Sequence, residues 1–389
     1  AAIVAAGRAT PRALPQPANL PTISILVPLF RERDIAGRLV KRLQSLSYPT
    51  KLLEICLIVE KHDTITRTAL ANTNLPKHMR QVVVPPGSLQ TKPRAMNYAL
   101  DFTHGDIIGV YDAEDAPAPD QLRVVAAEFE QAAPNVACLQ GKLDFYNPRT
   151  NWLSRCFTVD YAVWFRAILP GIARLGFAVP LGGTTLFFRR SVLETVGAWD
   201  AHNVTEDADL GIRLARLGWR TKLIATTTQE EANCRIWPWI KQRSRWIKGY
   251  AVTWAVHMRH PRRLWSDLGT WRFLGFQAVF LGAISQFVLA PFLWSFWLIL
   301  LGLPHPLIGT LPDVVILGLA TLFFAAEISN IAVGAWACRG QNHRWLIPWV
   351  PSLHFYFPLA AIASWKGLAE IVKAPFYWDK TDHGMESTS

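Results

Sequence analysis

The feature that most constrains this chain is a run of 31 residues, Phe273–Leu303, that contains no Asp, Glu, Lys or Arg. About 20 predominantly apolar residues in a helix are enough to cross the hydrocarbon core of a bilayer. Two further apolar stretches follow, Val314–Cys338 and Trp345–Trp365. The residues before Phe273 are mixed in polarity. The sequence therefore predicts a soluble domain followed by a membrane-embedded one.

Positive charge is concentrated beside these apolar stretches. The chain has a net charge of +11, and 51% of its residues are hydrophobic while 18% are charged. Basic residues precede the first stretch and follow the second, as is typical of the cytoplasmic side of a membrane protein; they are Arg259, Arg262, Arg263, Arg272, Arg339 and Arg344. We therefore expect a lipid bilayer, and no nucleic acid, among the partners. The five cysteines form no CxxC pair, which favours a reducing compartment without disulfides or a zinc site.

The part of the chain before the apolar stretches alternates between strand-like and helix-like segments. Short β-branched runs predict buried strands, and apolar residues every three or four positions predict helices. The predicted strands are Ile23–Pro28, Leu53–Glu60, Gln81–Val84, Ile107–Tyr111 and Val136–Leu143; the predicted helices are Ile35–Leu46, Lys92–Phe102, Gln121–Ala132 and Trp152–Phe165. This order predicts an α/β domain with a mainly parallel sheet, in which a ligand lies outside the carboxyl ends of the strands.

Acidic residues follow two of these strands. Glu60 ends the second strand, and Asp112, Glu114 and Asp115 follow the fourth in the segment IIGVYDAEDAP. If this segment is extended, Asp112 and Glu114 point the same way and can hold one hard cation that binds diphosphate oxygens. A plain solvated turn is the alternative. Asp115 would point to the other side of an extended segment, so we assign it to the turn.

Two glycine- and acid-containing segments follow. Pro180–Arg190 contains a glycine turn in which Gly183 allows a close backbone approach to a ligand, with a plain hairpin or bulge as the alternative. In VTEDADLGIRL, Thr205 can cap a helix that has Glu206 and Asp207 in its first turn. Capping explains these residue types without any chemistry, and it leaves Asp207 available as a general base.

Ile236–His257 has the mixture of aromatic and basic residues that is typical of an interfacial helix. Gln242, Arg245 and Trp246 stand at positions i, i+3 and i+4, so they share one helix face. A membrane-surface helix explains most of this segment. An amide, a fork-shaped cation and a flat indole together also suit a phosphate and a sugar ring.

The order of these motifs resembles the family-2 glycosyltransferases, specifically the membrane-embedded processive β-glycan synthases related to cellulose synthase. The resemblance rests on the strand that ends in Glu60, Asp112-x-Glu114, Thr205-Glu206-Asp207 and Gln242-Arg-Ser-Arg-Trp246, and it covers about Ile23–Tyr250. It implies a GT-A (Rossmann-like) domain followed by interfacial helices and an α-helical transmembrane domain. It also implies a UDP-sugar donor, Mg²⁺ or Mn²⁺, and inversion at the anomeric carbon.

The resemblance implies a role for each matching residue. Asp207 would be the catalytic base, and Asp112 and Glu114 would hold the metal, Glu114 either directly or through water. The donor would be bound by Glu32, Glu60, Lys92, Asp112, Arg245, Lys380 and Thr381, with Asp63 as an alternative to Glu60. The acceptor would be bound by Gly183, Glu206, Gln242 and Trp246. Lys380, Thr381 and His383 lie in FYWDKTDHG, which occupies the place of the family's gating loop.

The expected activity is polymerisation of a sugar, with glucose as the default, from a UDP-sugar into a β-linked polysaccharide that is moved across the membrane. Non-processive transfer to a polyprenyl-phosphate or another lipid acceptor is the alternative. The expected partners are the donor, the growing glycan, the bilayer and accessory export proteins. The expected location is a bacterial-type inner membrane, crossed several times, with the catalytic domain in the cytoplasm.

The expected organisation has five parts. Residues 1–20 form a linker or the end of a truncated transmembrane helix, 21–234 the catalytic domain, 235–272 interfacial helices, 273–372 the membrane region and 373–389 the gating-loop-like segment. Three single spans would place that last segment outside, whereas its lysines favour the inside. Either the proline-containing third stretch is re-entrant or interfacial, or the first stretch holds more than one helix. Glu327, inside the second stretch, would face a polymer channel or make a helix-packing hydrogen bond.

Overall fold

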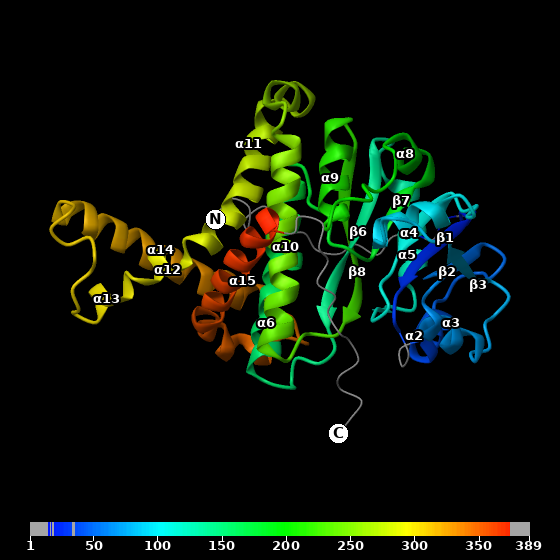
Figure 1. Ribbon diagram of the computed structural model, residues 1–389, viewed down its shortest axis with the longest axis horizontal. Coiled ribbons are helices and arrows are strands. Elements are labelled where there is room, and N and C mark those ends of the chain that lie inside the picture. Colours follow the sequence, from blue (N-terminus) through cyan, green and yellow to red (C-terminus); the bar gives the residue numbers. More distant parts are fainter. Residues whose placement is uncertain (1–14, 16, 18, 33–35, 374–389) are drawn as a thin grey trace.

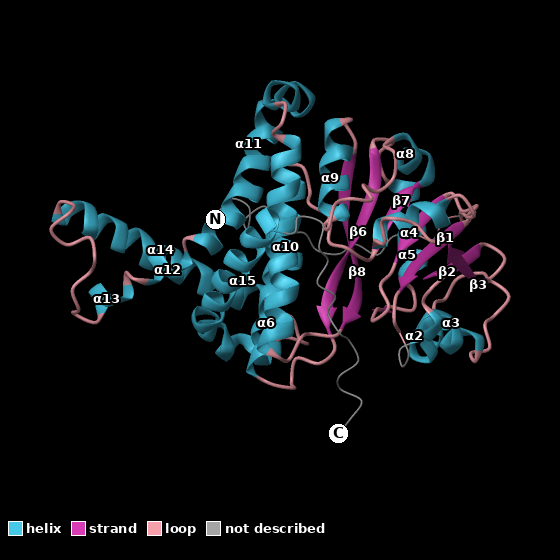
Figure 2. Cartoon of the chain, viewed as in Figure 1, coloured by secondary structure: helices cyan, strands magenta, loops and turns pink. Residues whose placement is uncertain are grey.

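The computed structural model describes residues 15, 17, 19–32 and 36–373 of the chain (Figure 1). A twisted sheet occupies one side of the molecule, and long helices stand side by side next to it (Figure 2). Helices α12 (Ala290–Trp294), α13 (Trp297–Leu300) and α14 (Asp313–Ala337) project on the side away from the sheet. The molecule is therefore divided between a sheet-centred part and a projecting helical part.

The sheet contains eight strands in the order β3-β2-β1-β4-β7-β6-β8-β5. Strands β1–β4 pair in parallel, and β7 joins β4 to β6 through antiparallel pairs. The strands are β1 Ile23–Leu29, β2 Leu53–Glu60, β3 Met79–Val84, β4 Ile107–Val110, β5 Ala116–Pro117, β6 Val136–Phe145, β7 Leu186–Arg189 and β8 Arg220–Glu230. All five predicted strands are present, and the prediction of a mainly parallel sheet is confirmed.

Helices connect the strands and cover both faces of the sheet. They are α2 Ala36–Gln44, α3 Thr64–Ala71, α4 Lys92–Leu100, α5 Gln121–Gln131, α6 Trp152–Val163, a π-helical turn Trp164–Ile168, α7 Leu169–Arg174, α8 Arg190–Thr195 and α9 Glu206–Arg216. The chain continues with α10 Ile236–His257, α11 Pro261–Val288, α12 to α14, a 3₁₀ helix Arg344–Ser352 and α15 Leu353–Lys373. The predicted helices of the N-terminal part each correspond to one of these.

Alternation along the central strands explains why both faces are covered. In β1, Leu26 packs into one apolar cluster with α4, α6 and α10, while Ile25 and Val27 pack into the cluster on the opposite face with α2 and α5. All three side chains are completely buried. A parallel strand buried on both faces needs apolar residues at successive positions, which is what the run ISILVPL supplies.

Strand β8 and helix α3 are among the elements that the sequence pattern does not predict. The β8 segment, RTKLIATTTQE, is rich in threonine and charged residues, and eight of its eleven residues are exposed or partly exposed. It therefore shows neither an apolar run nor a clean alternation. It is a strand because it pairs in parallel with β6 and in antiparallel with β5, two partners that are distant in sequence.

The apolar stretches adopt three different structures. The first is broken into α11, α12 and α13, with a bend of 61° after Val288. The second is the single helix α14. Only 17% of its most apolar 18-residue segment is buried. The third forms the 3₁₀ helix and α15, which packs along α10: Lys366 Nζ lies 3.3 Å from Ser244 Oγ. This third stretch therefore lies against the helices of the sheet-centred part.

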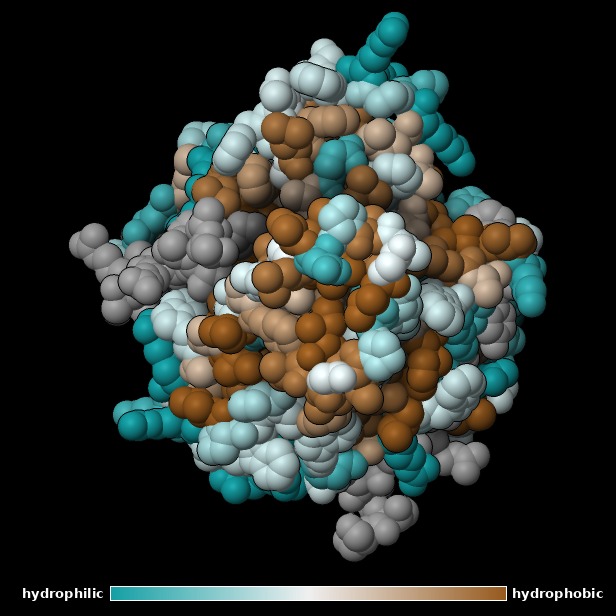
Figure 3. All heavy atoms as spheres, turned by 90° about the vertical axis from the view of Figure 1, so that its left-hand side faces the viewer, coloured by the Kyte–Doolittle hydropathy of each residue, from teal (hydrophilic) through white to brown (hydrophobic). Residues whose placement is uncertain are grey.

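By length and composition, three helices of the described chain can cross a membrane, and the bent pair α11–α13 would be a fourth. One of the three is Trp152–Arg174, which packs against the sheet. In this helix, 61% of the most apolar 18-residue segment is buried. Seen from the side of α12–α14, the surface carries a broad brown area of apolar side chains (Figure 3). Glu327 Oε2 lies 3.1 Å from His354 Nδ1, so this acid makes a hydrogen bond between α14 and α15.

Candidate active site

A cavity of about 310 Å³ opens at the carboxyl ends of β1, β2 and β4, beside the first turns of α4 and α9 and the middle of α10. Ten of the residues singled out in the sequence line it: Glu32, Glu60, Lys92, Asp112, Glu114, Gly183, Glu206, Asp207, Arg245 and Trp246. Gln242 does not line it, because its side-chain oxygen accepts a hydrogen bond from Asn233 Nδ2 at 2.7 Å. Lys380, Thr381 and His383 lie outside the described residues.

Lys92 is the cation at the centre of this cavity. It is the first residue of α4, whose N-cap is the preceding residue, Thr91. Its Nζ lies 2.5 Å from Asp112 Oδ1, 3.1 Å from the carbonyl oxygen of Gly183 and 3.9 Å from Glu206 Oε1. Burial disfavours the charged form of Lys92, but the charges of Asp112 and Glu206 outweigh burial and raise its pKa. Lys92 therefore stays positive and links β4 to α9.

The backbone after β4 is not extended, unlike the segment predicted to present Asp112 and Glu114 to a metal ion. The strand ends at Val110, and Asp112–Asp115 is a turn closed by a hydrogen bond from Asp115 N to the carbonyl oxygen of Asp112. Asp112 and Glu114 therefore do not lie on an extended segment as predicted, although both line the cavity. Asp115 is completely buried and accepts hydrogen bonds from Asp112 N and the Thr184 hydroxyl. Its assignment to the turn is confirmed.

The donor set suits a divalent cation that is shared with a diphosphate. The described residues contain no cluster of three or more His, Cys, Asp or Glu side chains arranged to hold a metal. Mg²⁺ is commonly bound by one or two carboxylates together with phosphate oxygens and water, and Asp112 and Glu114 supply that number. Behind them, burial and the nearby charges of Asp115, Glu114 and Asp112 raise the pKa of Glu230 well above its ordinary value. A cation bound nearby would lower this pKa, because it favours the charged form of the carboxylates around it.

Glu206 and Asp207 occupy the first turn of α9, as predicted. Burial raises the pKa of Asp207, and this effect outweighs the opposing ones of Lys92 and of backbone N–H groups that include Gly183 N–H. The pKa of Glu206 is also raised, by burial and by the charge of Asp207. Thr205 is the N-cap residue, but its side chain makes no capping hydrogen bond, so the predicted hydroxyl cap is wrong.

Gly183 joins the cation to the carboxylate. Its φ angle is 68°, in the left-handed region that side-chain-bearing residues rarely adopt. Its carbonyl oxygen accepts from Lys92, and a Cβ at this position would lie 3.5 Å from Asp207 Oδ2. The backbone at this glycine therefore lies close to both Lys92 and Asp207.

On α10, the consecutive residues Arg245 and Trp246 line the cavity, whereas Arg243 does not. Trp246 lines the cavity and packs with its ring centroid 6.1 Å from those of Phe157 and Tyr161. The guanidinium of Arg243 lies 4.9 Å from the Trp246 ring and forms an ion pair with Asp160. Arg243 therefore supports the indole from behind, while Arg245 faces the cavity.

The structure distinguishes the two acids that follow β2. Glu60 lines the cavity and forms an ion pair with Arg94 at 3.3 Å. Asp63 instead caps α3 by accepting from Thr66 N, and it also accepts from Arg31 N at 2.6 Å. Because Asp63 does not line the cavity, Glu60 is the better placed of the two for a ligand.

Several residues that line the cavity were not predicted from the sequence, among them Phe30, Gln90, Thr91, His202 and Asn203. Gln90 and Thr91 precede Lys92 directly, and His202 and Asn203 precede the VTEDAD motif. In the sequence, only their position next to a motif residue indicates that these four residues could lie at the site.

The chain is similar in sequence to known glycosyltransferases. Residues 107–325 match the family model described as glycosyl transferase family group 2. The chain is 27% identical over 263 residues to the β-monoglucosyldiacylglycerol synthase of Nostoc sp. (strain PCC 7120), covering 66% of this chain and 51% of that protein. It is 26% identical over 350 residues to the cellulose synthase 1 catalytic subunit of Komagataeibacter xylinus, covering 85% and 42%. The chain thus spans about half the length of these relatives.

Among solved structures, the chain resembles the mannosyltransferase PcManGT from Pyrobaculum calidifontis in complex with GDP-Man and Mn²⁺. The TM-score is 0.54 with 17% identity, covering 94% of this chain and 92% of that one. The GT-A (Rossmann-like) α/β fold predicted from the sequence is confirmed. Because the family model spans more than half of the residues, the chain belongs to glycosyl transferase family group 2.

Proposed function

We propose that the protein is an inverting hexosyltransferase that uses a UDP-sugar at a membrane surface. The observation that carries the proposal is the single cavity in which Lys92, Asp112 and Glu114 lie beside Asp207. Cations and metal-binding carboxylates suit a diphosphate, and a buried carboxylate of raised proton affinity suits a general base. The neighbouring Arg245 and Trp246 supply a second cation and an aromatic surface for the two sugars.

In this mechanism Asp207 takes the proton of an acceptor hydroxyl as that oxygen attacks the anomeric carbon. The bond between the anomeric carbon and the β-phosphate oxygen breaks, and its electrons leave with UDP, so a single displacement inverts the configuration. A positioned base contributes about 10²–10⁴-fold to the rate. Lys92 and Arg245 would stabilise the charge that develops on the leaving diphosphate. A divalent cation on Asp112 and Glu114 would supply further charge neutralisation.

For the acceptor, we propose a growing β-linked glycan, with glucose as the sugar. The support is the position of Trp246, whose indole is fixed by Arg243, Phe157 and Tyr161 at the cavity wall. A ring held in this way offers the flat face on which a sugar stacks. The likeness to a cellulose synthase subunit over 85% of the chain is in accord with this choice.

A lipid acceptor is the second candidate, and one observation favours it. A cavity of about 390 Å³ lies between α10, α11 and α15, and its lining is apolar except for Arg259. An acyl chain suits such a lining better than a hydroxyl-rich glycan does, because buried hydroxyls need hydrogen-bond partners. The likeness to a glucosyldiacylglycerol synthase agrees with this alternative.

For the membrane region, we propose that α11–α13 and α14 form a hairpin and that α15 stays at the interface. Phe296 and Trp297 pack against Phe323, so the two arms are in contact. Arginines flank both ends of the hairpin, which favours a cytoplasmic location for each end. An even number of crossings would keep α15 on the side of the catalytic domain. We propose a bacterial-type inner membrane with the catalytic domain in the cytoplasm, and the arginines beside the hairpin support the cytoplasmic side.

The experiment is incubation of the purified protein in lipid nanodiscs with Mg²⁺ or Mn²⁺ and, separately, UDP-glucose, UDP-N-acetylglucosamine and GDP-mannose. We expect UDP release and a β-linked polymer with UDP-glucose, and loss of both when EDTA removes the cation. A product of one sugar on a lipid would favour the second candidate. Absence of sugar transfer from every donor would overturn the proposed function.

A further inference from the structure

Helix α10 contacts α9 and the residues just before it through three residues spaced by four, Gly249, Thr253 and His257, which therefore share one helix face. A Cβ on Gly249 would lie 2.2 Å from Thr205 Cγ2, so only glycine lets the helix approach here. Thr253 Oγ1 accepts from Asn203 Nδ2 at 3.1 Å. We call Gly249, Thr253 and His257 the α9–α10 seam.

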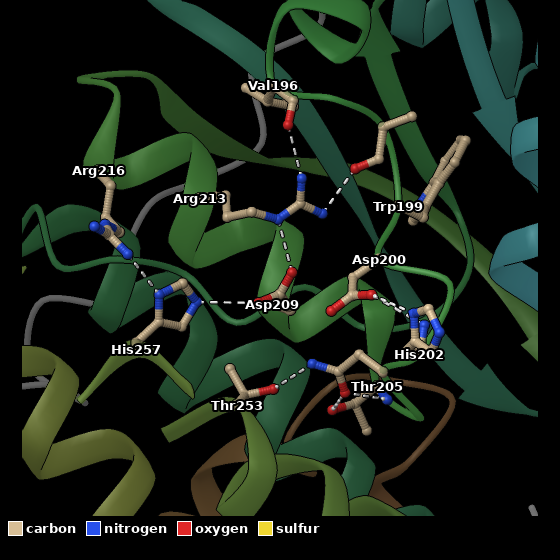
Figure 4. Close-up of polar contacts among 12 residues, drawn as sticks. Val196, Trp199, Asp200, His202, Thr205, Asp209, Arg213, Arg216, Thr253 and His257 are labelled. Carbon is tan, nitrogen blue, oxygen red and sulfur yellow. Dashed lines mark hydrogen bonds and ion pairs between the residues drawn. The ribbon is translucent and has the colours of Figure 1, made fainter. Parts of the chain in front are cut away.

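The third contact of the seam is a buried hydrogen bond between His257 and Asp209, shown in Figure 4. His257 Nε2 lies 3.0 Å from Asp209 Oδ1, and its other ring nitrogen, Nδ1, lies 3.1 Å from Arg216 Nη1. A guanidinium can only donate, so Nδ1 must accept and Nε2 must carry the proton that is donated to Asp209. The ring is thus neutral and fixed in one tautomer.

Both partners of His257 are themselves held in place. The second oxygen of Asp209 accepts from Arg213 Nε at 2.7 Å, and Arg213 also donates to the backbone oxygens of Val196 and Ala198 (Figure 4). Arg216 forms an ion pair with Asp267 of α11 at 2.6 Å. The side chains of Asp209 and His257 are only 4% and 3% exposed. The hydrogen bond is therefore shielded from water. A buried hydrogen bond of this kind is stronger than one at the surface, because the protein interior has a lower dielectric constant.

The seam connects the two helices that carry the opposite sides of the candidate active site. Asp209 lies two residues after Asp207 on α9, and His257 lies about three turns after Arg245 and Trp246 on α10. We propose that the seam, and His257 in particular, is a positioning device that sets the distance between the base Asp207 and the acceptor held by α10. This inference rests on the proposed function. His257 itself touches no reacting atom.

A displacement of about 1 Å between reacting groups can cost about 10²-fold in rate. We therefore expect His257→Leu to lower the rate of sugar transfer to the acceptor by about 10-fold or more. Hydrolysis of the UDP-sugar by water, which does not need the acceptor, should change much less. The ratio of transfer to hydrolysis should fall about 10-fold. His257→Gln, which retains one donor and one acceptor, should restore the ratio to within about 3-fold of the wild type.

A matched control exists elsewhere in the fold. His343 is buried and bonds Asp144 at 3.0 Å and Arg166 at 3.0 Å, the same set of partner types as His257 has. His343→Leu should lower the thermal unfolding midpoint, as His257→Leu does, but leave the transfer-to-hydrolysis ratio unchanged. Thr253→Val, a milder change in the seam, should lower the ratio in the same direction and keeps the test available if His257→Leu does not fold.

The measurements are UDP release and radiolabelled product in nanodiscs, with UDP binding as a check of the donor side. If the His257 and Thr253 variants change the ratio no more than His343→Leu does, the positioning role is overturned while the proposed function stands. If the wild-type protein transfers no sugar, both are overturned.

Discussion

Asp207 is held between opposing influences on its proton affinity. Burial raises its pKa, whereas Lys92 and the N–H groups of Ala208 and Gly183 lower it, and burial prevails. A carboxylate near the start of a helix would otherwise be a weak base, because the helix dipole favours its charged form. The enclosure of α9 by the sheet and α10 thus gives Asp207 a proton affinity suited to a base.

We expect Asp207→Asn to lower sugar transfer by about 10²-fold or more, because the amide cannot take the acceptor proton. Binding of UDP should be retained, since the change keeps the shape of the side chain. Transfer of label from the UDP-sugar and calorimetric titration with UDP measure the two effects. Asp120→Asn, at an exposed N-cap position without a side-chain capping bond, is the control and should behave as the wild type. Normal turnover by Asp207→Asn would remove Asp207 from the mechanism.

The raised pKa of Asp207 predicts a pH dependence. The base works only when deprotonated, so activity is lost as the pH falls through a value above that of an ordinary aspartate, about 3.9. Lys92→Met removes a charge that lowers this pKa, so the acidic limb of kcat/KM should move to higher pH. The same change at the exposed Lys51 should leave the profile in place. A shift of the limb to lower pH in Lys92→Met would contradict this account.

At the scale of elements, the approach of α10 to α9 depends on the absence of a side chain at one position. Alanine is favoured over glycine by about 1 kcal/mol in a free helix interior. At Gly249 the added methyl would meet Thr205 at 2.2 Å, so the helices would have to separate. Steric exclusion between elements therefore outweighs helix propensity here.

We expect Gly249→Ala to destabilise the protein by about 1–3 kcal/mol, as overpacking does, and to lower activity. Gly282→Ala, at a position of α11 with nothing within 4 Å of the added atom, should be neutral or slightly stabilising. Thermal unfolding and transfer assays on the two variants provide the comparison. Equal stability of both would show that α10 can move away from α9 without cost.

At the scale of the whole molecule, the projecting helices expose the apolar surface expected of a membrane-inserted part. On α14, Leu322 is 68% exposed and Ile328 is 69% exposed. Leu217, at the end of α9 in the sheet-centred part, is similarly exposed at 58%. Exposure alone thus does not distinguish the two regions, but the length and apolar composition of α14 do.

We expect Leu322→Lys combined with Ile328→Lys to shift the protein out of the membrane fraction. A lysine at the centre of a membrane helix costs about 3 kcal/mol on insertion scales. Leu217→Lys should leave the distribution unchanged, because this position follows α9 in the sheet-centred part and is not on α14. Flotation with liposomes measures the bound fraction of each variant. Unaltered binding by the double variant would contradict insertion of α14.

The chain order alone supplied much of this architecture. The apolar runs ISILVPL and LEICLIVE predict buried strands because each residue reports the burial of its own position. The same local logic predicts the membrane character of Phe273–Leu303 and the helix that begins with Glu206 and Asp207. Ten of the singled-out residues line one cavity because strands that run in parallel bring their carboxyl ends to one edge.

The tertiary structure alone decided the remainder. In the turn Asp112–Asp115, the Asp115 carboxylate accepts a hydrogen bond from the Thr184 hydroxyl. The two residues are 69 positions apart, so no local sequence pattern reveals this contact. Gln242 shares a helix face with Arg245 in the sequence pattern, yet it turns to Asn233 instead of the cavity. The contact between His257 and Asp209 spans 48 positions and depends on how closely two helices pack. Sequence periodicity reports which side of an element is buried, whereas contacts between distant elements depend on the packing of the whole chain.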